Sequence, residues 1–203
     1  FVEYLREPAH VDSRINIIDL ETGAYNQAYF TLRLRQELSR ASHNKYSFSL
    51  AFIKVYQRGL VHGEARLISP ARALRLILTS FDPNLREEDI LAYMGQQTFA
   101  LLLPHLPADA ARDVLTFLRT QIGLVSPDQI SEGRSNAIYC SIGFVVYQQQ
   151  STVNEILTQA AQALEEADTA VYGQVYQFVP QPNPPPQTTG RPPIGTLSPK
   201  PGR

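Results

Sequence analysis

The sequence contains almost no cysteine. Cys140 is the single cysteine among 203 residues, so the chain has neither an internal disulfide nor a zinc site built from cysteines. This composition is typical of a reducing compartment, and we expect a cytoplasmic protein. Cys140 lies in a run that is predicted to be a buried strand, where a free thiol packs as a small apolar residue.

The sequence also lacks an excess of positive or negative residues, and it lacks a long apolar run. Eighteen Lys and Arg residues stand against nineteen Asp and Glu, which gives a formal net charge of -1. The chain therefore lacks the basic excess that attracts a domain to nucleic acid. The longest apolar stretch, around Ile138–Tyr147, contains Ser141 and Gly143 and is too short to span a bilayer. We expect no nucleic-acid partner and no membrane insertion by this segment.

Methionine is also scarce, and proline is unevenly distributed. Met94 is the single methionine and the chain opens at Phe1, so we expect a piece of a longer polypeptide in which residues 1–18 are a linker from an upstream domain. Residues 180–203 hold nine of the fifteen prolines and are predicted to be a disordered, extended tail or linker. A P-x-x-P ligand for another domain is the alternative to a spacer. Residues 19–179 remain as one domain.

The periodicity of that domain alternates between helix and strand. Helical spacing of apolar residues predicts four helices, at Ala28–Ala41 with Asn26 as N-cap, Ala65–Phe81, Ala108–Ile122 and Val153–Tyr172. Short apolar runs predict strands at Phe48–Tyr56, at Asn136–Tyr147 as one strand or a pair, at Val175–Val179 as an edge, and in a hairpin of Asp89–Met94 and Phe99–Leu103 around Gly95. This order predicts an α+β fold, with helices flanking a mostly antiparallel central sheet.

Five segments carry motifs in a fixed order. Asp19–Phe30 reads D-L-E-T-G-A-Y-N-Q-A-Y-F, Ser49–Tyr56 reads S-L-A-F-I-K-V-Y, and Ala92–Pro104 reads A-Y-M-G-Q-Q-T-F-A-L-L-L-P; Tyr139–Phe144 and Ala167–Tyr172 read Y-C-S-I-G-F and A-D-T-A-V-Y. They resemble the motifs D-x-L-T-G-L-x-N-R-R-x-F, S-L-L-L-L-D-I-D, A-R-Y-G-G-D-E-F-A-I-L-L-P, T-V-S-I-G-V and A-D-x-A-L-Y of GGDEF domains, the bacterial diguanylate cyclase family. The resemblance covers the chain from Asp19 to about Val179 and implies a nucleotide-cyclase type of α+β fold.

The resemblance also implies where the family's chemistry takes place. A 3′-hydroxyl of one GTP attacks the α-phosphate of another, with a divalent metal held by carboxylates at the end of the first strand and in the signature hairpin. Lys54 and Tyr56 stand at the two acidic positions of the strand. The signature has become G-Q-Q-T-F, over Gly95, Gln96, Gln97, Thr98 and Phe99. Since no acidic side chain remains in either place, we expect no catalysis, no metal and no other cofactor.

Substrate recognition departs from the family pattern too. Gln57–Glu64 reads Q-R-G-L-V-H-G-E, without a counterpart of the Asn and Asp that hold guanine in the family, and the basic pair that follows the last helix is missing. Two interpretations of Lys54, Tyr56 and the turn stay open. They are ordinary strand-end residues beside an inert polar turn, or Lys54 replaces the charge of the metal and a nucleotide binds without turnover.

One motif of the family is retained. Arg86 and Asp89 form an R-x-x-D pattern five residues before Gly95, the spacing of the inhibitory site that binds cyclic di-GMP in the family. An Arg fork matches guanine O6 and N7, and a carboxylate accepts from the guanine N–H edge. The alternative is a charged loop that enters a strand. A supporting Arg of the family is replaced here by Phe117.

Three functions are therefore open. The first is a catalytically inactive, regulatory GGDEF-like domain, either a cyclic di-GMP receptor through Arg86 and Asp89 or a transmission module between signalling domains. The second is a structural homodimerisation or partner-docking module with no nucleotide ligand. The third, least favoured by the residues, is an active diguanylate cyclase that makes cyclic di-GMP from two GTP.

Overall fold

The structure is a computed structural model that describes residues 16–58, 65–81, 84–124, 137–149, 151–169 and 173–179. Of the predicted linker only residues 16–18 fall within these ranges, and the predicted tail 180–203 lies outside them. None of the helices in the described part of the chain has the length and apolar character needed to cross a bilayer.

Four helices and one seven-stranded sheet make up the described fold. The helices are α1 (Gln27–Asn44), α2 (Pro70–Phe81), α3 (Ala108–Leu124) and α4 (Val153–Asp168). The strands are β1 (Tyr25–Asn26), β2 (Ser49–Arg58), β3 (Ala65–Leu67), β4 (Ile90–Tyr93), β5 (Phe99–Leu103), β6 (Ile138–Val146) and β7 (Val175–Gln177). Their order is β1-β4-β5-β2-β6-β7, with β3 beside β2. Only the β1–β4 and β6–β7 pairs are parallel, which confirms the predicted α+β fold with a mostly antiparallel sheet.

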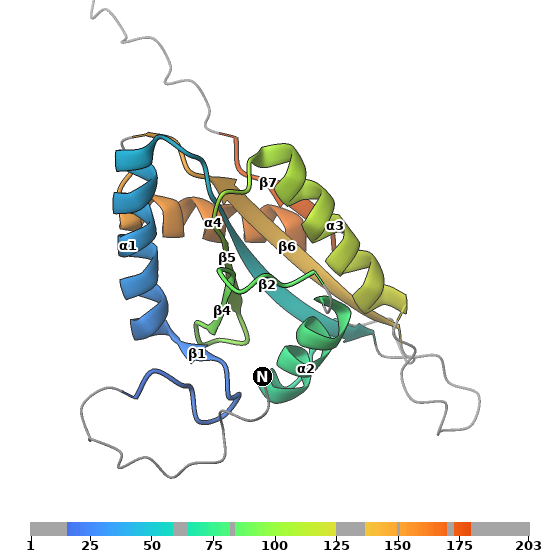
Figure 1. Cartoon of the computed structure of the whole chain (residues 1–203). Coiled ribbons are helices and arrows are strands. Elements are labelled where there is room, and N and C mark those ends of the chain that lie inside the picture. Colours follow the sequence, from blue (N-terminus) through green and yellow to red (C-terminus); the bar gives the residue numbers. More distant parts are fainter. Residues whose placement is uncertain are drawn as a thin grey trace, which may run out of the picture.

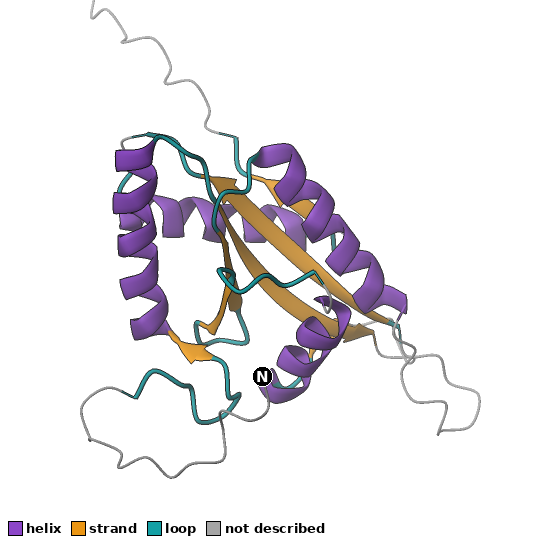
Figure 2. Ribbon diagram, in the orientation of Figure 1, coloured by secondary structure: helices purple, strands orange, loops and turns teal. Residues whose placement is uncertain are grey.

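The helices cover both faces of this sheet (Figure 1, Figure 2). α2 and α3 pack on one face and α1 and α4 on the other, and each pair encloses its own apolar cluster. The residues of β2 alternate between the clusters: Ile53 belongs to the α2/α3 side and Phe52 to the α1/α4 side. Because side chains of a strand point alternately to its two faces, Lys54 and Tyr56 project from the same face as Phe52, toward α4.

The helix starts follow local capping chemistry. The side chain of Asn26 accepts a hydrogen bond from the Tyr29 backbone N–H at 2.9 Å, so the predicted N-cap of α1 is confirmed. α4 begins with a capping box, in which Thr152 and Glu155 each bind the other's backbone N–H. These contacts fix the N-terminal ends of α1 and α4, the two helices that cover the same face of the sheet.

Two predicted helices differ from the structure, and one open alternative is decided by it. The helix predicted at Ala65–Phe81 is wrong at its start, because Ala65–Leu67 pairs with β2 as β3 and α2 begins only at Pro70, a residue suited to a first helical turn since it has no N–H to leave unpaired. Of the two alternatives for Asn136–Tyr147, one strand or a pair, the structure has one strand, because β6 spans Ile138–Val146 and pairs with β2 over nine residues. The last helix ends at Asp168 rather than Tyr172.

Gly143 sets how closely α4 approaches the sheet. A Cβ atom at this position of β6 would lie 2.0 Å from the backbone N of Leu164 and 2.2 Å from the carbonyl carbon of Ala163. Only hydrogen fits in that space, so α4 rests directly on the backbone of β6. This approach places the last turns of α4 beside the end of β2.

We expect Gly143→Ala to destabilise the protein by about 3 kcal/mol, because the helix backbone has to move away from the strand. Gly123 is the matched control: it lies in α3 with nothing within 4 Å of an added Cβ, and Gly123→Ala stabilises by up to about 1 kcal/mol. Urea unfolding of both variants measures the difference. Equal midpoints for Gly143→Ala and the wild type would contradict the close packing.

Candidate functional site

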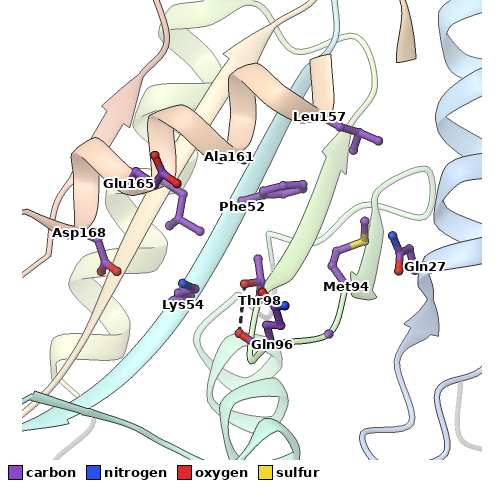
Figure 3. A pocket seen from close by; sticks show the side chains of 12 residues that line it. Gln27, Phe52, Lys54, Met94, Gln96, Thr98, Leu157, Ala161, Glu165 and Asp168 are labelled. Carbon is purple, nitrogen blue, oxygen red and sulfur yellow. Dashed lines mark hydrogen bonds between the residues drawn. The ribbon is translucent and has the colours of Figure 1, made fainter. Parts of the chain in front are cut away.

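A pocket of about 370 Å³ lies where β2, α4 and the β4–β5 turn meet (Figure 3). One wall is apolar and is formed by Phe52, Met94, Leu157, Ala161 and Leu164. The remaining lining residues are polar or belong to the turn: Gln27, Lys54, Gly95, Gln96, Thr98, Glu165 and Asp168. The pocket thus brings together the strand end and the signature turn that the sequence singled out.

The β4–β5 turn keeps the shape of a tight hairpin although its residues are unusual for one. The Thr98 N–H donates to the carbonyl oxygen of Gly95 at 2.9 Å, and the Met94 N–H donates to that of Thr98 at 2.9 Å. Three successive residues have positive φ, 83° at Gly95, 49° at Gln96 and 58° at Gln97. A non-glycine residue in this region costs about 1 kcal/mol. The predicted hairpin is therefore confirmed, with two glutamines in conformations that favour Gly or Asn.

Tyr56 ties the end of β2 to the end of α4. Its hydroxyl donates a hydrogen bond to Oδ2 of Asp168 at 2.5 Å, and its ring stacks on that of Tyr139 with 5.3 Å between centroids and 16° between planes. Partial burial, followed by the hydrogen bond and the negative charge of Asp168, raises the pKa of Tyr56 well above its usual value. The position of a family metal ligand thus carries a phenol engaged with a neighbouring helix.

Lys54 lies one step earlier on the same face of β2 and lines the pocket (Figure 3). The ion pairs found among the described residues are formed by Arg40 and Arg86, and none of them includes Lys54. Its ammonium group therefore faces the pocket as an unpaired positive charge.

The pocket also contains two carboxylates that the sequence analysis did not place there. Glu165 and Asp168 project from α4, three residues apart and so on one face of the helix. Together with Ala161 and Leu164 they follow the helical spacing of the pocket wall, which is the signal that would have found them. Asp168 binds the hydroxyl of Tyr56 at the end of β2. Glu165 lines the pocket one helical turn earlier on α4.

The donor set does not fit a divalent cation. Mg²⁺ prefers several oxygen ligands around a strongly negative centre, but here Lys54 contributes a positive charge and one oxygen of Asp168 already accepts the Tyr56 hydroxyl. The turn supplies amide and hydroxyl oxygens instead of carboxylates. In the described ranges, no three side chains of His, Cys, Asp or Glu gather closely enough to hold a metal ion.

Arg86 and Asp89 come together elsewhere, in the loop before β4, and they bind each other. The guanidinium donates from Nη2 to Oδ1 of Asp89 at 2.7 Å and from Nε to Oδ2 at 3.3 Å. It also donates to the carbonyl oxygen of Pro104 at 2.9 Å and pairs with Glu88 at 3.0 Å. The Asp89 side chain is only 1% exposed. The pair joins the loop before β4 to the end of β5, and a ligand of either residue has to displace these bonds.

The sheet order and the helices on both faces agree with the nucleotide-cyclase type of α+β fold that the sequence motifs imply. The family model described as "Diguanylate cyclase, GGDEF domain" matches residues 16–172, so the chain belongs to the GGDEF family.

Known proteins agree with this membership. The chain is 27% identical over 154 residues to diguanylate cyclase DgcP of Pseudomonas aeruginosa and 28% identical over 172 residues to the probable diguanylate cyclase DgcE of Escherichia coli. These matches cover 76% and 80% of this chain but only 23% and 15% of the relatives, so the chain spans less than a quarter of their length. The GGDEF domain of DgcB from Caulobacter crescentus, solved in complex with c-di-GMP, superposes with a TM-score of 0.67 at 17% identity, covering 85% of this chain and 98% of that one.

We expect Tyr56→Phe to lower the stability at pH 7 by about 1 kcal/mol, because the hydrogen bond to Asp168 is lost. The raised pKa of Tyr56 gives a second signature. Only the unfolded chain releases this proton near pH 10, so the wild type loses stability as the pH rises above 10, and the variant loses less. Tyr176→Phe is the control, since this exposed tyrosine of β7 has no hydrogen bond from its hydroxyl among those found in the described part. Thermal unfolding between pH 8 and pH 11 measures both effects, and identical slopes for Tyr56→Phe and the wild type would contradict the bond.

Proposed function

We propose that this chain is a GGDEF domain without cyclase activity that serves as a regulatory module of a larger cytoplasmic signalling protein. The observation that carries the proposal is the end of β2, where Lys54 faces the pocket and Tyr56 binds Asp168. The small share of its relatives that the chain covers supports a module inside a longer protein.

The chemistry of the family explains why these two residues matter. Joining two GTP molecules develops negative charge on phosphate oxygens, which a divalent metal neutralises. Two unit charges about 4 Å apart repel by roughly 4 kcal/mol at an effective dielectric near 20, and a divalent ion doubles that figure. The ammonium group of Lys54 therefore opposes the cation that the reaction needs, and the amides of Gln96 and Gln97 do not compensate for it.

The purified chain is expected to form no cyclic di-GMP from GTP with Mg²⁺ or Mn²⁺. Chromatographic detection of the product after a long incubation measures this, with an active diguanylate cyclase assayed in parallel as the positive control. The names of the relatives favour the opposite result, because DgcP is called a diguanylate cyclase. Product that disappears in Glu165→Gln or Asp168→Asn would establish an active enzyme and overturn the proposal.

Cyclic di-GMP binding is a second candidate function. Its support is the R-x-x-D pair itself, with the Arg86 side chain 35% exposed, and the structural neighbour DgcB, which was solved with c-di-GMP. Against it stand the internal bonds of the pair and the buried carboxylate of Asp89. The geometry favours a role of Arg86 and Asp89 in fixing the loop, and therefore a transmission, dimerisation or docking module over a receptor.

We expect isothermal titration with cyclic di-GMP to show no saturable heat up to about 100 μM ligand. Arg86→Ala is expected to destabilise the chain by about 3 kcal/mol, because the buried Asp89 carboxylate loses the guanidinium charge and keeps only the hydrogen bond from the backbone N–H of residue 86. Arg75→Ala, at an exposed position of α2, removes the same charge as a control. Saturable binding that is lost in Arg86→Ala and kept in Arg75→Ala would establish the receptor function.

A further inference from the structure

We infer that Lys54 is the residue that excludes divalent cations from the pocket, because its ammonium group is the one positive charge beside two α4 carboxylates in the described lining. This role rests on the proposed function, since it concerns a pocket that does not work as a metal centre. It goes further by assigning the exclusion to one side chain.

Of the residues that the structure describes, three with charged side chains line the pocket, Lys54 from β2 and Glu165 and Asp168 from α4. Figure 3 shows Lys54 between the turn that carries Gln96 and Thr98 and the helix that carries the two carboxylates. One positive charge therefore stands among two negative charges inside a single pocket. Glu165 and Asp168 are exposed, whereas Lys54 at the strand end is partly buried beside the apolar wall.

Without Lys54 the described lining of the pocket would keep two carboxylates and no positive charge. Glu165 and Asp168 present carboxylates from one face of α4, and the side chains of Gln96 and Thr98 add an amide and a hydroxyl oxygen from the turn. Hard oxygen donors of this kind bind Mg²⁺ and Mn²⁺. Lys54 is the one cationic side chain among the described lining residues, so within this set it alone offsets part of the negative charge of the two carboxylates.

Tyr56 contributes to the same effect from the same face of β2. Its hydroxyl occupies Oδ2 of Asp168, so one of the carboxylate oxygens is already bound. The two positions of β2 thus act in different ways: Lys54 supplies positive charge to the pocket, and Tyr56 holds a carboxylate against the end of the strand.

The test is Mn²⁺ binding to the full chain, followed by the electron paramagnetic resonance signal of free Mn²⁺. Lys54→Asp is compared with the wild type and with Lys45→Asp, which makes the same change of charge at the exposed C-cap of α1. We expect Lys54→Asp to bind Mn²⁺ at least about tenfold more tightly than either, since a repulsive charge becomes a ligand. Adding Asp168→Asn to Lys54→Asp is expected to remove the gain.

Lys54→Met provides a second measurement that does not depend on a new carboxylate. This variant removes the positive charge of the ammonium group and nearly keeps the side-chain length. It is therefore expected to bind Mn²⁺ more tightly than the wild type and more weakly than Lys54→Asp. Circular dichroism establishes that each variant is folded. The inference is overturned if neither Lys54 variant exceeds Lys45→Asp, or if the wild type itself binds Mn²⁺ in a way that Asp168→Asn abolishes. If Mn²⁺ binding gives either of these results and the wild type makes no cyclic di-GMP, only the role of Lys54 is refuted. If the wild type makes cyclic di-GMP, the proposed function is refuted.

Discussion

The pairing of β2 with β5 and β6 is the constraint on which the site depends. β2 lies between these two strands, and its register with β6 runs from Ser49 opposite Val146 to Gln57 opposite Ile138. Since a shift of one residue would exchange the two faces of a strand, this register decides that Lys54 and Tyr56 face α4. Gly143 adds the second condition, because it lets α4 lie on the backbone of β6.

Residues that differ from the family motifs make specific contacts in this structure. Tyr56 binds Asp168 and stacks on Tyr139, so a position suited to a metal ligand now connects β2 with α4. The turn keeps its hydrogen bonds while Gln96 and Gln97 adopt positive φ. The scaffold of a GGDEF domain is thus preserved around a pocket that Lys54, Glu165 and Asp168 line together. A regulatory module needs the fold and its surfaces, and these do not depend on the carboxylates of the catalytic centre.

Much of this architecture was predictable from local patterns. The N-cap at Asn26, the hairpin around Gly95 and the apolar periodicity of α3 each follow from short-range chemistry. The limits of α2 were missed because Leu67 fits a helical pattern, although its segment pairs with β2 and Pro70 marks the true start. The pocket was predicted only in part. Motif positions gave Lys54 and the turn, but Glu165 enters through the packing of α4 on β6, and the mutual bonds of Arg86 and Asp89 arise from a loop conformation that an R-x-x-D pattern does not specify.

If Lys54 has the role we infer, the pocket beside it holds no divalent cation even when nucleotide and metal are abundant. A crystal structure of the wild-type chain, grown with Mn²⁺ and a non-hydrolysable GTP analogue, tests it through the anomalous scattering of manganese. We expect no anomalous peak in the pocket and an intact hydrogen bond between Tyr56 and Asp168. A manganese peak ligated by Glu165 and Asp168, with the Lys54 side chain turned away, would contradict it.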